Sequence, residues 1–458
     1  MSVGSGDLYQ AMRKYVESAI RLLAGVCPEG PPRVLVGLDE WKRYPDNRFR
    51  LRDREEPFWV QCIQAHQDRL HSLDEYHRLV ASLDAIPHIA QQLENMVGTA
   101  HESQRIEIAH VTDYLLWRLP RITGGLRFDE AQFNQLFNNF EADLQRTSFS
   151  YVVLAPLLGL KVESAPIGLG PDIEIDDMTD EEIVRCLKLE LLPDPFGLRR
   201  IADVKSAAAV RVQYHLEKRV GRDDVSEGEE AFDVERAAIE RAMAVLHALR
   251  VFKDGRVSIP GLLQFSPHWP LGGGFRYQYS NPGPMPWFNK YDLPQNDADE
   301  FSAFWKRFQD VTAKGALANA VRRFSYASDR DRHDDRLVDL MIAAESLFLA
   351  DAGAAQERGE LRYRLALRAA FFVDSPEYSR RAILKHMRRA YDARSAIVHG
   401  GGEPDRDLLK SPTDAPLPLQ DFVKVTEHLV RLALKKAIDM AEATGSLLID
   451  WDALILPS

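Results

Sequence analysis

The pattern of apolar and polar positions changes twice along the chain. Between residues 8 and 139, apolar side chains recur at the 3.6-residue spacing of a helix buried on one face. The clearest repeat is carried by Leu70, Leu73, Leu79, Leu83 and Ile86. Because long strand-like runs are absent from this stretch, we predict an all-helical N-terminal region over residues 1–145.

Residues 146–290 have the pattern of short strands. SYVVLAPLLGLKV and PIGLGPDIEID are short apolar or alternating runs separated by Pro and Gly. In residues 210–217 every second side chain is apolar, which predicts a strand with one buried face. A helical stripe with Phe232, Ile239 and Met243 interrupts these strands. We therefore predict an α+β middle region.

A Pro-rich stretch, residues 282–294, separates these strands from a third region. Residues 295–445 are helical in pattern and close with an apolar stripe over residues 422–432 and with Gly445 as a C-cap. We predict a helical domain here, followed by a tail over residues 446–458. The expected fold class is α+β, multidomain and mainly helical, with an all-α C-terminal bundle.

Composition and charge narrow the class of protein. Charged residues make up 28% and the hydrophobic set 45%, as in ordinary folded proteins, which argues against a disordered or fibrous chain. A length of 458 residues predicts more than one core. The net charge of -11 excludes a surface that is basic throughout, so any RNA-binding surface must be local.

The cysteines and the longest apolar run bear on the compartment. Cys27, Cys62 and Cys186 are far apart and lack CxxC spacing, so neither a disulfide framework nor a cysteine zinc site is predicted. The longest apolar run, residues 152–160, contains Pro156 and is too short to span a bilayer. With no secretory apolar core at the N-terminus, we expect a cytoplasmic protein without a membrane segment.

The predicted helix at residues 336–349 carries a carboxylate within its apolar stripe. Glu345 lies between apolar positions, and a buried carboxylate needs a partner. The next predicted helix, ELRYRLALRAAFF, carries Arg364 and Arg368. We expect Glu345 to pair with one of them, the alternative being a solvated Glu345 at the domain edge.

The following helix, residues 376–399, carries a second set of polar candidates. Tyr391 and Arg394 fall on an otherwise apolar stripe, so Arg394 faces inward or toward a partner. Basic residues cluster elsewhere on this helix, at Arg381, Lys385, Arg388 and Arg389. Such a cluster can hold phosphate groups, but it is also typical of a solvated helix face.

Three linked segments in this region resemble the HEPN superfamily, specifically its Apea-like branch: DDRLVDLMIAAESLF, RYRLALRAA and YDARSAIVHG. The resemblance covers about residues 297–444 and implies a helix bundle. In that family an Arg-x4-His motif forms the active pair of a metal-independent ribonuclease, usually completed by the same pair of a second subunit. It implies Arg394 and His399 as the catalytic pair. Ser395 stands where many catalytic members carry an amide or an acid.

The spacing of this motif occurs twice more, at residues 105–110 and 381–386. Only the pair at residues 394–399 follows the Glu345 helix and precedes a glycine run, residues 400–402. The two residue types suit the chemistry, because the 2′-hydroxyl of RNA is an internal nucleophile. Cleavage then needs a group that moves a proton, such as histidine, and a charge that stabilises the phosphorane, such as arginine.

The geometry of a regular helix limits this pair. Five positions along a helix place two side chains about 140° apart, so His399 shares the face of Arg394 only if the helix ends or distorts between them. The glycines at residues 400–402 make an ending near His399 plausible.

The expected function is that of a homodimeric cytoplasmic endoribonuclease, acting in antiviral defence or as a growth-arrest toxin, with RNA as its partner and no DNA. We expect no metal and no cofactor. The first 290 or so residues would sense a trigger or restrain the C-terminal domain. The alternative is a non-catalytic HEPN module that supplies a dimer interface or a nucleotide pocket. No GxSxG, GxxxxGK[ST] or HExxH motif occurs in the chain.

Overall fold

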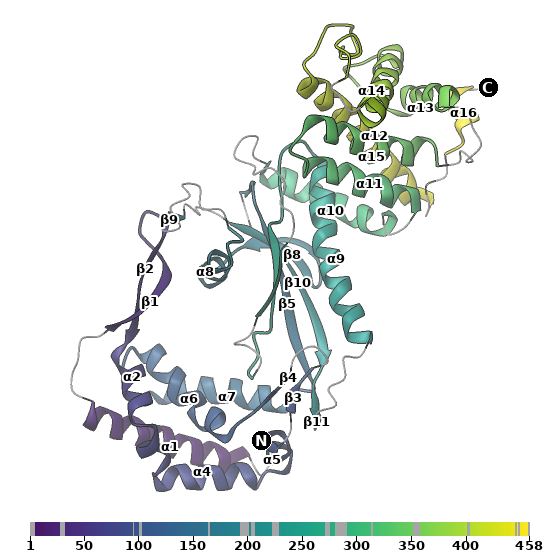
Figure 1. The fold of residues 1–458 in the computed structure, drawn as a ribbon. Coiled ribbons are helices and arrows are strands. Elements are labelled where there is room, and N and C mark those ends of the chain that lie inside the picture. The colour runs from purple at the N-terminus through teal and green to yellow at the C-terminus, as the bar shows by residue number, and fades with distance from the viewer. Residues whose placement is uncertain are drawn as a thin grey trace.

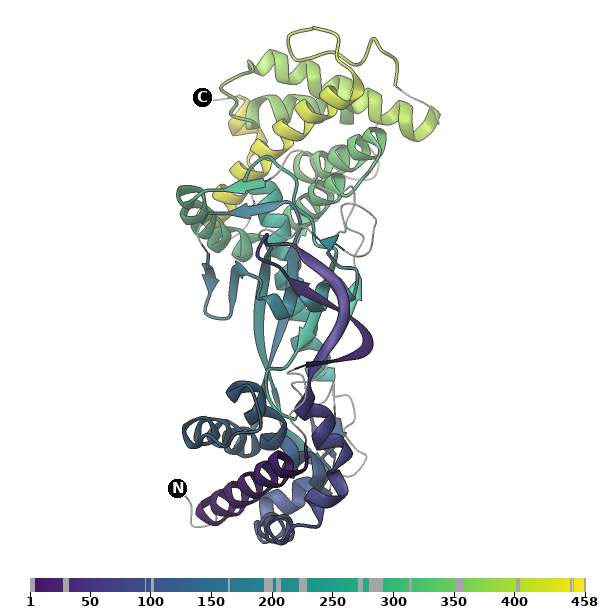
Figure 2. The ribbon, with the colours of Figure 1, turned by 90° about the vertical axis from the view of Figure 1, so that its left-hand side faces the viewer.

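The fold is that of a computed structural model of the chain. The structure describes residues 5–27, 33–94, 96–99, 103–163, 165–192, 201–202, 207–221, 229–270, 275–279, 291–312, 315–350, 358–400, 404–444, 447 and 449–456. Over these residues the protein is α+β and mostly helical, as the sequence predicts. It is elongated, with the N-terminal helices at one end, a sheet in the middle and the C-terminal helices at the other end (Figures 1 and 2).

The N-terminal end is a group of helices with its own apolar core. They are α1 (Ser5–Val26), α2 (Phe58–Ala65), α3 (Gln67–His71), α4 (Asp74–Asp84), α5 (Pro87–Glu94), α6 (Ile108–Thr123) and α7 (Glu130–Gln145). Of the predicted apolar repeat, Leu70, Leu79 and Leu83 are fully buried in this core. Helical periodicity here thus marks the faces that the helices bury against one another.

The expectation that this region is all-helical is wrong at two places. Strands β1 (Arg33–Arg43) and β2 (Phe49–Pro57) form an antiparallel hairpin, to which β9 (Ile201–Ala202) adds a short edge. β3 (Met96–Gly98) and β4 (Ser103–Arg105) pair further along. Charged residues occupy both faces of β2, FRLRDREEP, so the alternation that identifies a half-buried strand is missing.

The middle of the molecule is a six-stranded antiparallel sheet of order β13-β12-β5-β10-β8-β7. Its strands are β5 (Ser148–Leu157), β7 (Ile167–Gly170), β8 (Ile173–Asp177), β10 (Ala208–Glu217), β12 (Gly261–Phe265) and β13 (Phe275–Tyr279). In β10 the apolar side chains of Val212, Tyr214 and Leu216 are buried and the residues between them are not fully buried, so the predicted one-faced strand is confirmed.

Helices cover both faces of this sheet. α9 (Glu229–Phe252) packs on β10 and β5, and α8 (Asp180–Lys188) packs with Leu154, Ala209 and Leu263 on the other side. Short pairings complete the region: β6 (Leu160–Val162) lies parallel to β14 (Tyr291–Leu293), and β11 (Arg219–Gly221) pairs with β3.

The C-terminal end consists of helices in the described residues. They are α10 (Gln295–Val311), α11 (Gly315–Ser328), α12 (His333–Phe348), α13 (Arg358–Phe372), α14 (Arg380–Gly400), α15 (Leu419–Thr444) and the short α16 (Trp451–Ile455). The predicted helical pattern is therefore found. The predicted C-cap Gly445, the glycines Gly401 and Gly402, and most of the Pro-rich stretch lie outside the described residues.

One apolar core runs from the sheet into the C-terminal helices. It contains β-sheet residues such as Phe149, residues of α9, and residues of α15 up to Ala441. Arg250 on α9 is 3% exposed and donates hydrogen bonds to the carbonyl of Val257, to Ser325 and to both carboxylate oxygens of Asp329. A buried guanidinium with this many acceptors ties α9 firmly to α11.

The cysteines differ from the sequence-based expectation. Cys27 and Cys62 form a disulfide with a Cα–Cα distance of 6.1 Å, although 35 residues separate them. The pairing arises because the end of α1 and the middle of α2 are brought together by the fold. Cys186 is free and buried in α8, and burial raises the pKa of its thiol. No helix among the described residues is both long and apolar enough to cross a membrane.

Candidate functional site

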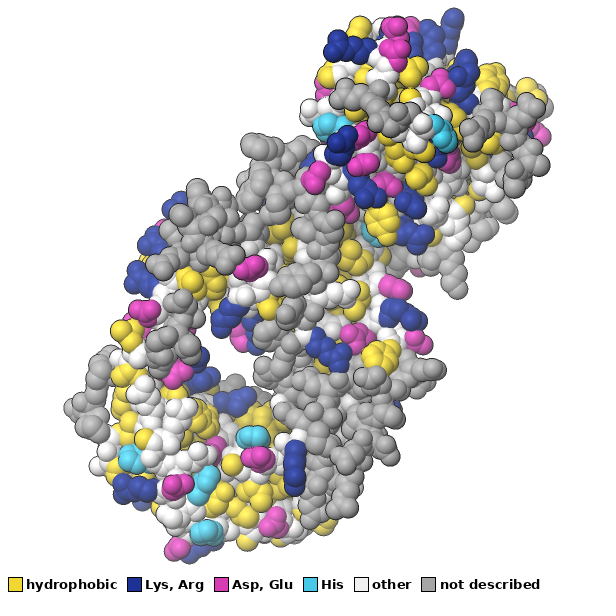
Figure 3. Space-filling view, viewed as in Figure 1, with side chains coloured by type: hydrophobic (Ala, Val, Ile, Leu, Met, Phe, Trp, Pro, Cys, Tyr) yellow, Lys and Arg dark blue, Asp and Glu magenta, His cyan; other side chains and the backbone are white. Residues whose placement is uncertain are grey.

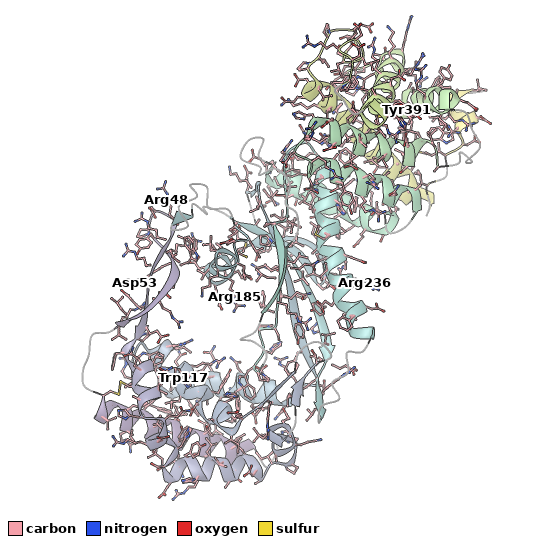
Figure 4. All side chains as sticks on the ribbon, in the orientation of Figure 1. Arg48, Asp53, Trp117, Arg185, Arg236 and Tyr391 are labelled. Atoms are coloured by element: carbon pink, nitrogen blue, oxygen red, sulfur yellow. A yellow bond between two sulfur atoms is a disulfide. The ribbon has the colours of Figure 1, made fainter. Side chains whose placement is uncertain are left out.

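The predicted site residues lie on three C-terminal helices that pack against one another, α12, α13 and α14 (Figures 1 and 4). Glu345 extends from α12 and Arg394 from α14. The Nη2 of Arg394 lies 3.6 Å from Oε2 of Glu345, and the two side chains are 22% and 26% exposed. The stripe position of Arg394 thus points it toward α12.

This contact corrects the predicted partner of Glu345, which is neither Arg364 nor Arg368. Arg364 lies 3.6 Å from Glu360 on its own helix. Arg368 donates a 2.6 Å hydrogen bond to the carbonyl of Phe348 and stacks over the ring of Trp451. Both arginines lie on α13, which packs on α12. The side chain of Glu345, however, points from α12 toward α14, so its partner is Arg394.

Burial governs the electrostatics of the Glu345–Arg394 pair. Desolvation raises the pKa of Glu345, and the charge of Arg394 opposes that shift. The Nε of Arg394 is buried and has no hydrogen-bond partner among the described residues. The Nη groups of Arg394 make no hydrogen bond among the described residues and the side chain is 22% exposed, so these N–H groups are left for an anion such as phosphate.

His399 lies in the last turn of α14 and is exposed. The helix runs through both motif residues and ends at Gly400, so the two side chains leave it about 140° apart. Within one chain, therefore, α14 directs Arg394 toward α12 and His399 into solvent. In one chain, Arg394 and His399 do not contact each other among the described residues.

Tyr391 and Asp392, which precede Arg394 on α14, hold this helix against its neighbours. Tyr391 is half-buried and packs on the shared core (labelled in Figure 4), and Ser395 is half-buried. Asp392 accepts two hydrogen bonds from Nη1 of Arg362, at 2.9 and 3.0 Å, which joins α14 to α13. Asp392 lies inside the motif segment YDARSAIVHG, but its role as a positioning residue depends on Arg362 of another helix and is not evident from the sequence.

The four basic residues proposed to hold RNA do not form one free patch. Nζ of Lys385 and Nη2 of Arg389 bond to the carboxylate of Asp414, at 2.8 and 2.5 Å. These two cations hold the pKa of Asp414 at about 2. Arg381 is exposed and Arg388 half-buried, and neither has an acidic partner among the described residues.

Over the C-terminal helices, Figure 3 shows Lys and Arg side chains interspersed with Asp and Glu. Asp414 could not be identified in advance, because only the fold of the loop after α14 brings it back to that helix.

The Arg-x4-His spacing also occurs at residues 381–386 and 105–110, and the histidines of these two matches differ in burial. His386 is fully buried, bonds through Nε2 to Oγ1 of Thr426 at 2.9 Å and packs on Phe422, and burial lowers its pKa to about 4. It is a core residue. Arg105 and His110, by contrast, are exposed and line a cavity between the N-terminal helices and the segment after β12.

Searches among family models, curated proteins and solved structures found no match to this chain. The fold and the site therefore define its class at the level of structure: an α+β protein whose C-terminal helices hold a half-buried glutamate–arginine pair, with an exposed histidine further along the same helix as the arginine.

Proposed function

We propose that residues 295–444 form a HEPN-type domain of the Apea-like branch and that the protein is an endoribonuclease acting without a metal. The observation that carries this proposal is the state of Arg394. Its guanidinium is held 3.6 Å from Glu345, its Nη groups make no hydrogen bond among the described residues, and an exposed histidine follows on the same helix. These are the groups that cleavage of an RNA phosphodiester requires.

The reaction follows from the roles of these groups. The 2′-oxygen of RNA attacks the adjacent phosphorus and loses its proton to a histidine acting as base. Arg394 stabilises the charge that develops on the phosphorane oxygens, and Glu345 keeps its guanidinium in place. The bond to the 5′-oxygen then breaks as that oxygen takes a proton from an acid. The products are a 2′,3′-cyclic phosphate and a 5′-hydroxyl.

Two protons move in this reaction, so two histidines suit it better than one. We propose that a second copy of the chain supplies the other His399. In support, Val398 beside it on α14 is 49% exposed and Tyr363 on α13 is 50% exposed, so large apolar side chains face solvent on both helices. The N-terminal and middle regions would then sense a trigger or restrain a defence or growth-arrest nuclease.

A specific observation favours a second candidate, a non-catalytic HEPN interaction module. Asp414 neutralises Lys385 and Arg389, and Glu345 lies beside Arg394, so few cations near α14 remain free for a phosphate backbone. In this alternative, Arg394 and His399 belong to a dimer interface.

The test compares His399→Ala and Arg394→Ala with His77→Ala and Arg78→Ala. The control residues are an exposed histidine and an exposed arginine on α4, at the other end of the molecule. Loss of a proton-transfer group or of a charge stabiliser should lower the rate of RNA cleavage by roughly 10²–10⁴-fold. Both controls should keep the wild-type rate.

Product analysis adds a second criterion. Cleavage should persist in a metal chelator and leave 2′,3′-cyclic phosphate ends, because the nucleophile belongs to the RNA itself. Ends that carry a 5′-phosphate would mean that water attacked instead. If the four variants and the wild type are equally inactive on RNA and equally folded, the interaction-module function is favoured.

A further inference from the structure

Two adjoining cavities lie far from α14, between the N-terminal helices and the segment that follows β12. Their volumes are about 440 and 540 Å³, within the range of sites for small molecules. Both are lined by Tyr114 and Arg118 of α6 and by Trp269 and Pro270. Because 151 positions in the sequence separate Arg118 from Trp269, only the fold creates this site.

Aromatic rings build a fixed wall of the double cavity. The ring of Tyr114 meets Trp269 edge-on at 5.6 Å, and both pack on Phe140 at 4.9 and 5.0 Å. Trp117, one helical turn along α6, is half-buried and lines the first cavity; Figure 4 labels it on the side of these helices that faces the sheet. Such rings offer flat surfaces on which a planar heterocycle can stack.

Two arginines at the rim of the first cavity have no acidic partner among the described residues. They are Arg105 and Arg118, and both are exposed. The guanidinium of Arg118 lies 3.9 Å from the centre of the Tyr114 ring. Arg146 of the second cavity differs, because it bonds to Asp143 at 2.7 Å. Two exposed guanidinium groups that no carboxylate neutralises, beside an aromatic wall, suit an anionic group such as phosphate.

A carboxyl group forms the floor of the first cavity. Asp113 is 5% exposed, and its Oδ1 accepts a 3.1 Å hydrogen bond from the hydroxyl of Tyr15. Its Oδ2 lies 3.5 Å from Nε2 of Gln67 and 3.6 Å from Nε2 of His71. Burial raises the pKa of Asp113. This carboxyl is held in place by its neighbours and can accept a hydrogen bond from the N–H edge of a base.

We propose that this double cavity binds one nucleoside phosphate, with the base on the rings of Trp117 and Trp269, which Tyr114 supports, and the phosphate at Arg105 and Arg118. Aromatic faces, exposed guanidinium groups and a buried acceptor are the three kinds of contact that a nucleotide needs. The volumes of about 440 and 540 Å³ suit one nucleotide. The site is independent of the chemistry proposed at α14, and it gives the N-terminal region a small-molecule ligand.

The test is binding of AMP, GMP, CMP and UMP to the full-length protein, followed by tryptophan fluorescence and calorimetry. At least one of the four should bind saturably with one site per chain and quench the fluorescence. Its nucleoside, which lacks the phosphate, should bind at least 10-fold more weakly. The absence of saturable binding by all four at millimolar concentration would overturn the proposal.

Variants then locate the site. Arg118→Ala and Arg105→Ala should each weaken binding at least 10-fold, and Trp117→Leu should remove most of the fluorescence quenching. Arg121→Ala, an exposed arginine on the same helix that does not line either cavity, is the matched control and should bind like the wild type. Since Arg105 and Arg118 are exposed, these changes leave the core intact, which a thermal midpoint checks.

Two outcomes point elsewhere. Equal affinities in Arg118→Ala and Arg121→Ala would place the nucleotide outside this cavity and overturn the proposal. A 5′-phosphorylated oligoribonucleotide that binds where none of the mononucleotides does would also overturn it, because the site would then belong to a strand.

Discussion

Single buried residues set how this protein responds to acid. His386 lies in the C-terminal core with its Nε2 bonded to Thr426, and burial lowers its pKa to about 4. His247 on α9 behaves alike: it bonds to Ser325, and burial beside Arg250 lowers its pKa to about 3. Both rings must stay neutral for the helices around them to pack.

The first consequence is a pH dependence of stability. Because the unfolded chain protonates His386 below about pH 6.5 and the folded chain only near pH 4, its contribution is complete above pH 6.5 and is lost as the pH falls to about 4. The loss is roughly 3 kcal/mol for a shift of this size. Between pH 7 and 4.5, the urea midpoint of His386→Gln should fall less steeply than that of the wild type. The exposed-residue control His77→Gln should follow the wild type, and an unchanged slope in His386→Gln would contradict the prediction.

At the scale of elements, α14 is held from three sides. Asp392 bonds to α13, Arg394 lies beside Glu345 of α12, and Asp414 of the following loop bonds to Lys385 and Arg389. Asp414 of this loop therefore neutralises part of the positive charge on the basic face of α14. The ion pairs with Asp414 are exposed, so water and salt weaken them. RNA can bind this face of α14 only if its phosphates replace Asp414 as the partner of Lys385 and Arg389.

Releasing these cations is a second testable change. In Asp414→Asn, Lys385 and Arg389 lose their negative partner and become available to phosphate groups. Affinity for single-stranded poly-U should rise, and the logarithmic salt dependence should steepen by roughly 0.7–1.4 units for one or two added phosphate contacts. Asp407→Asn removes a charge of the same loop whose one ion pair among the described residues is with Lys410 and not with α14, so it serves as the control. Identical salt slopes in the two variants would exclude this face from RNA binding.

At the scale of the whole molecule, the proposed nuclease and the cavity at α6 lie at opposite ends of an elongated chain (Figures 1 and 2). The core shared by the sheet and the C-terminal helices, into which Arg250 is buried, spans part of this distance, whereas the N-terminal helices have an apolar core of their own. A ligand at one end can influence the other only if it changes the packing along this path.

We predict that the proposed homodimer depends on the exposed apolar surface next to His399. Val398→Asp places a charge on the exposed apolar side chain next to His399, so it should convert a dimer into a monomer in light scattering at micromolar concentration. RNA cleavage should be lost with the dimer. Leu456→Asp alters another exposed apolar residue, 74% accessible, and should leave the dimer intact. A wild-type monomer with full activity would exclude a composite site.

Periodicity alone determined the local structure: the helical pattern of the N-terminal and C-terminal regions and the one-faced strand β10. These features depend on which face of a segment is apolar, and the sequence records that directly. The hairpin β1–β2 escaped prediction because charged residues lie on both faces of β2, so no alternation marks a buried face. The motif and its histidine at the end of α14 were also readable from the sequence, since they concern one helix.

Partners were decided by the tertiary structure. The pairing of Glu345 with Arg394, of Asp414 with Lys385, and of Cys27 with Cys62 each joins segments whose relative placement follows from helix packing and loop closure. The cavity between α6 and Trp269 is the extreme case, because its walls come from two distant parts of the chain. A sequence specifies which side chains are available. The direction in which each leaves its packed helix decides which of them meet.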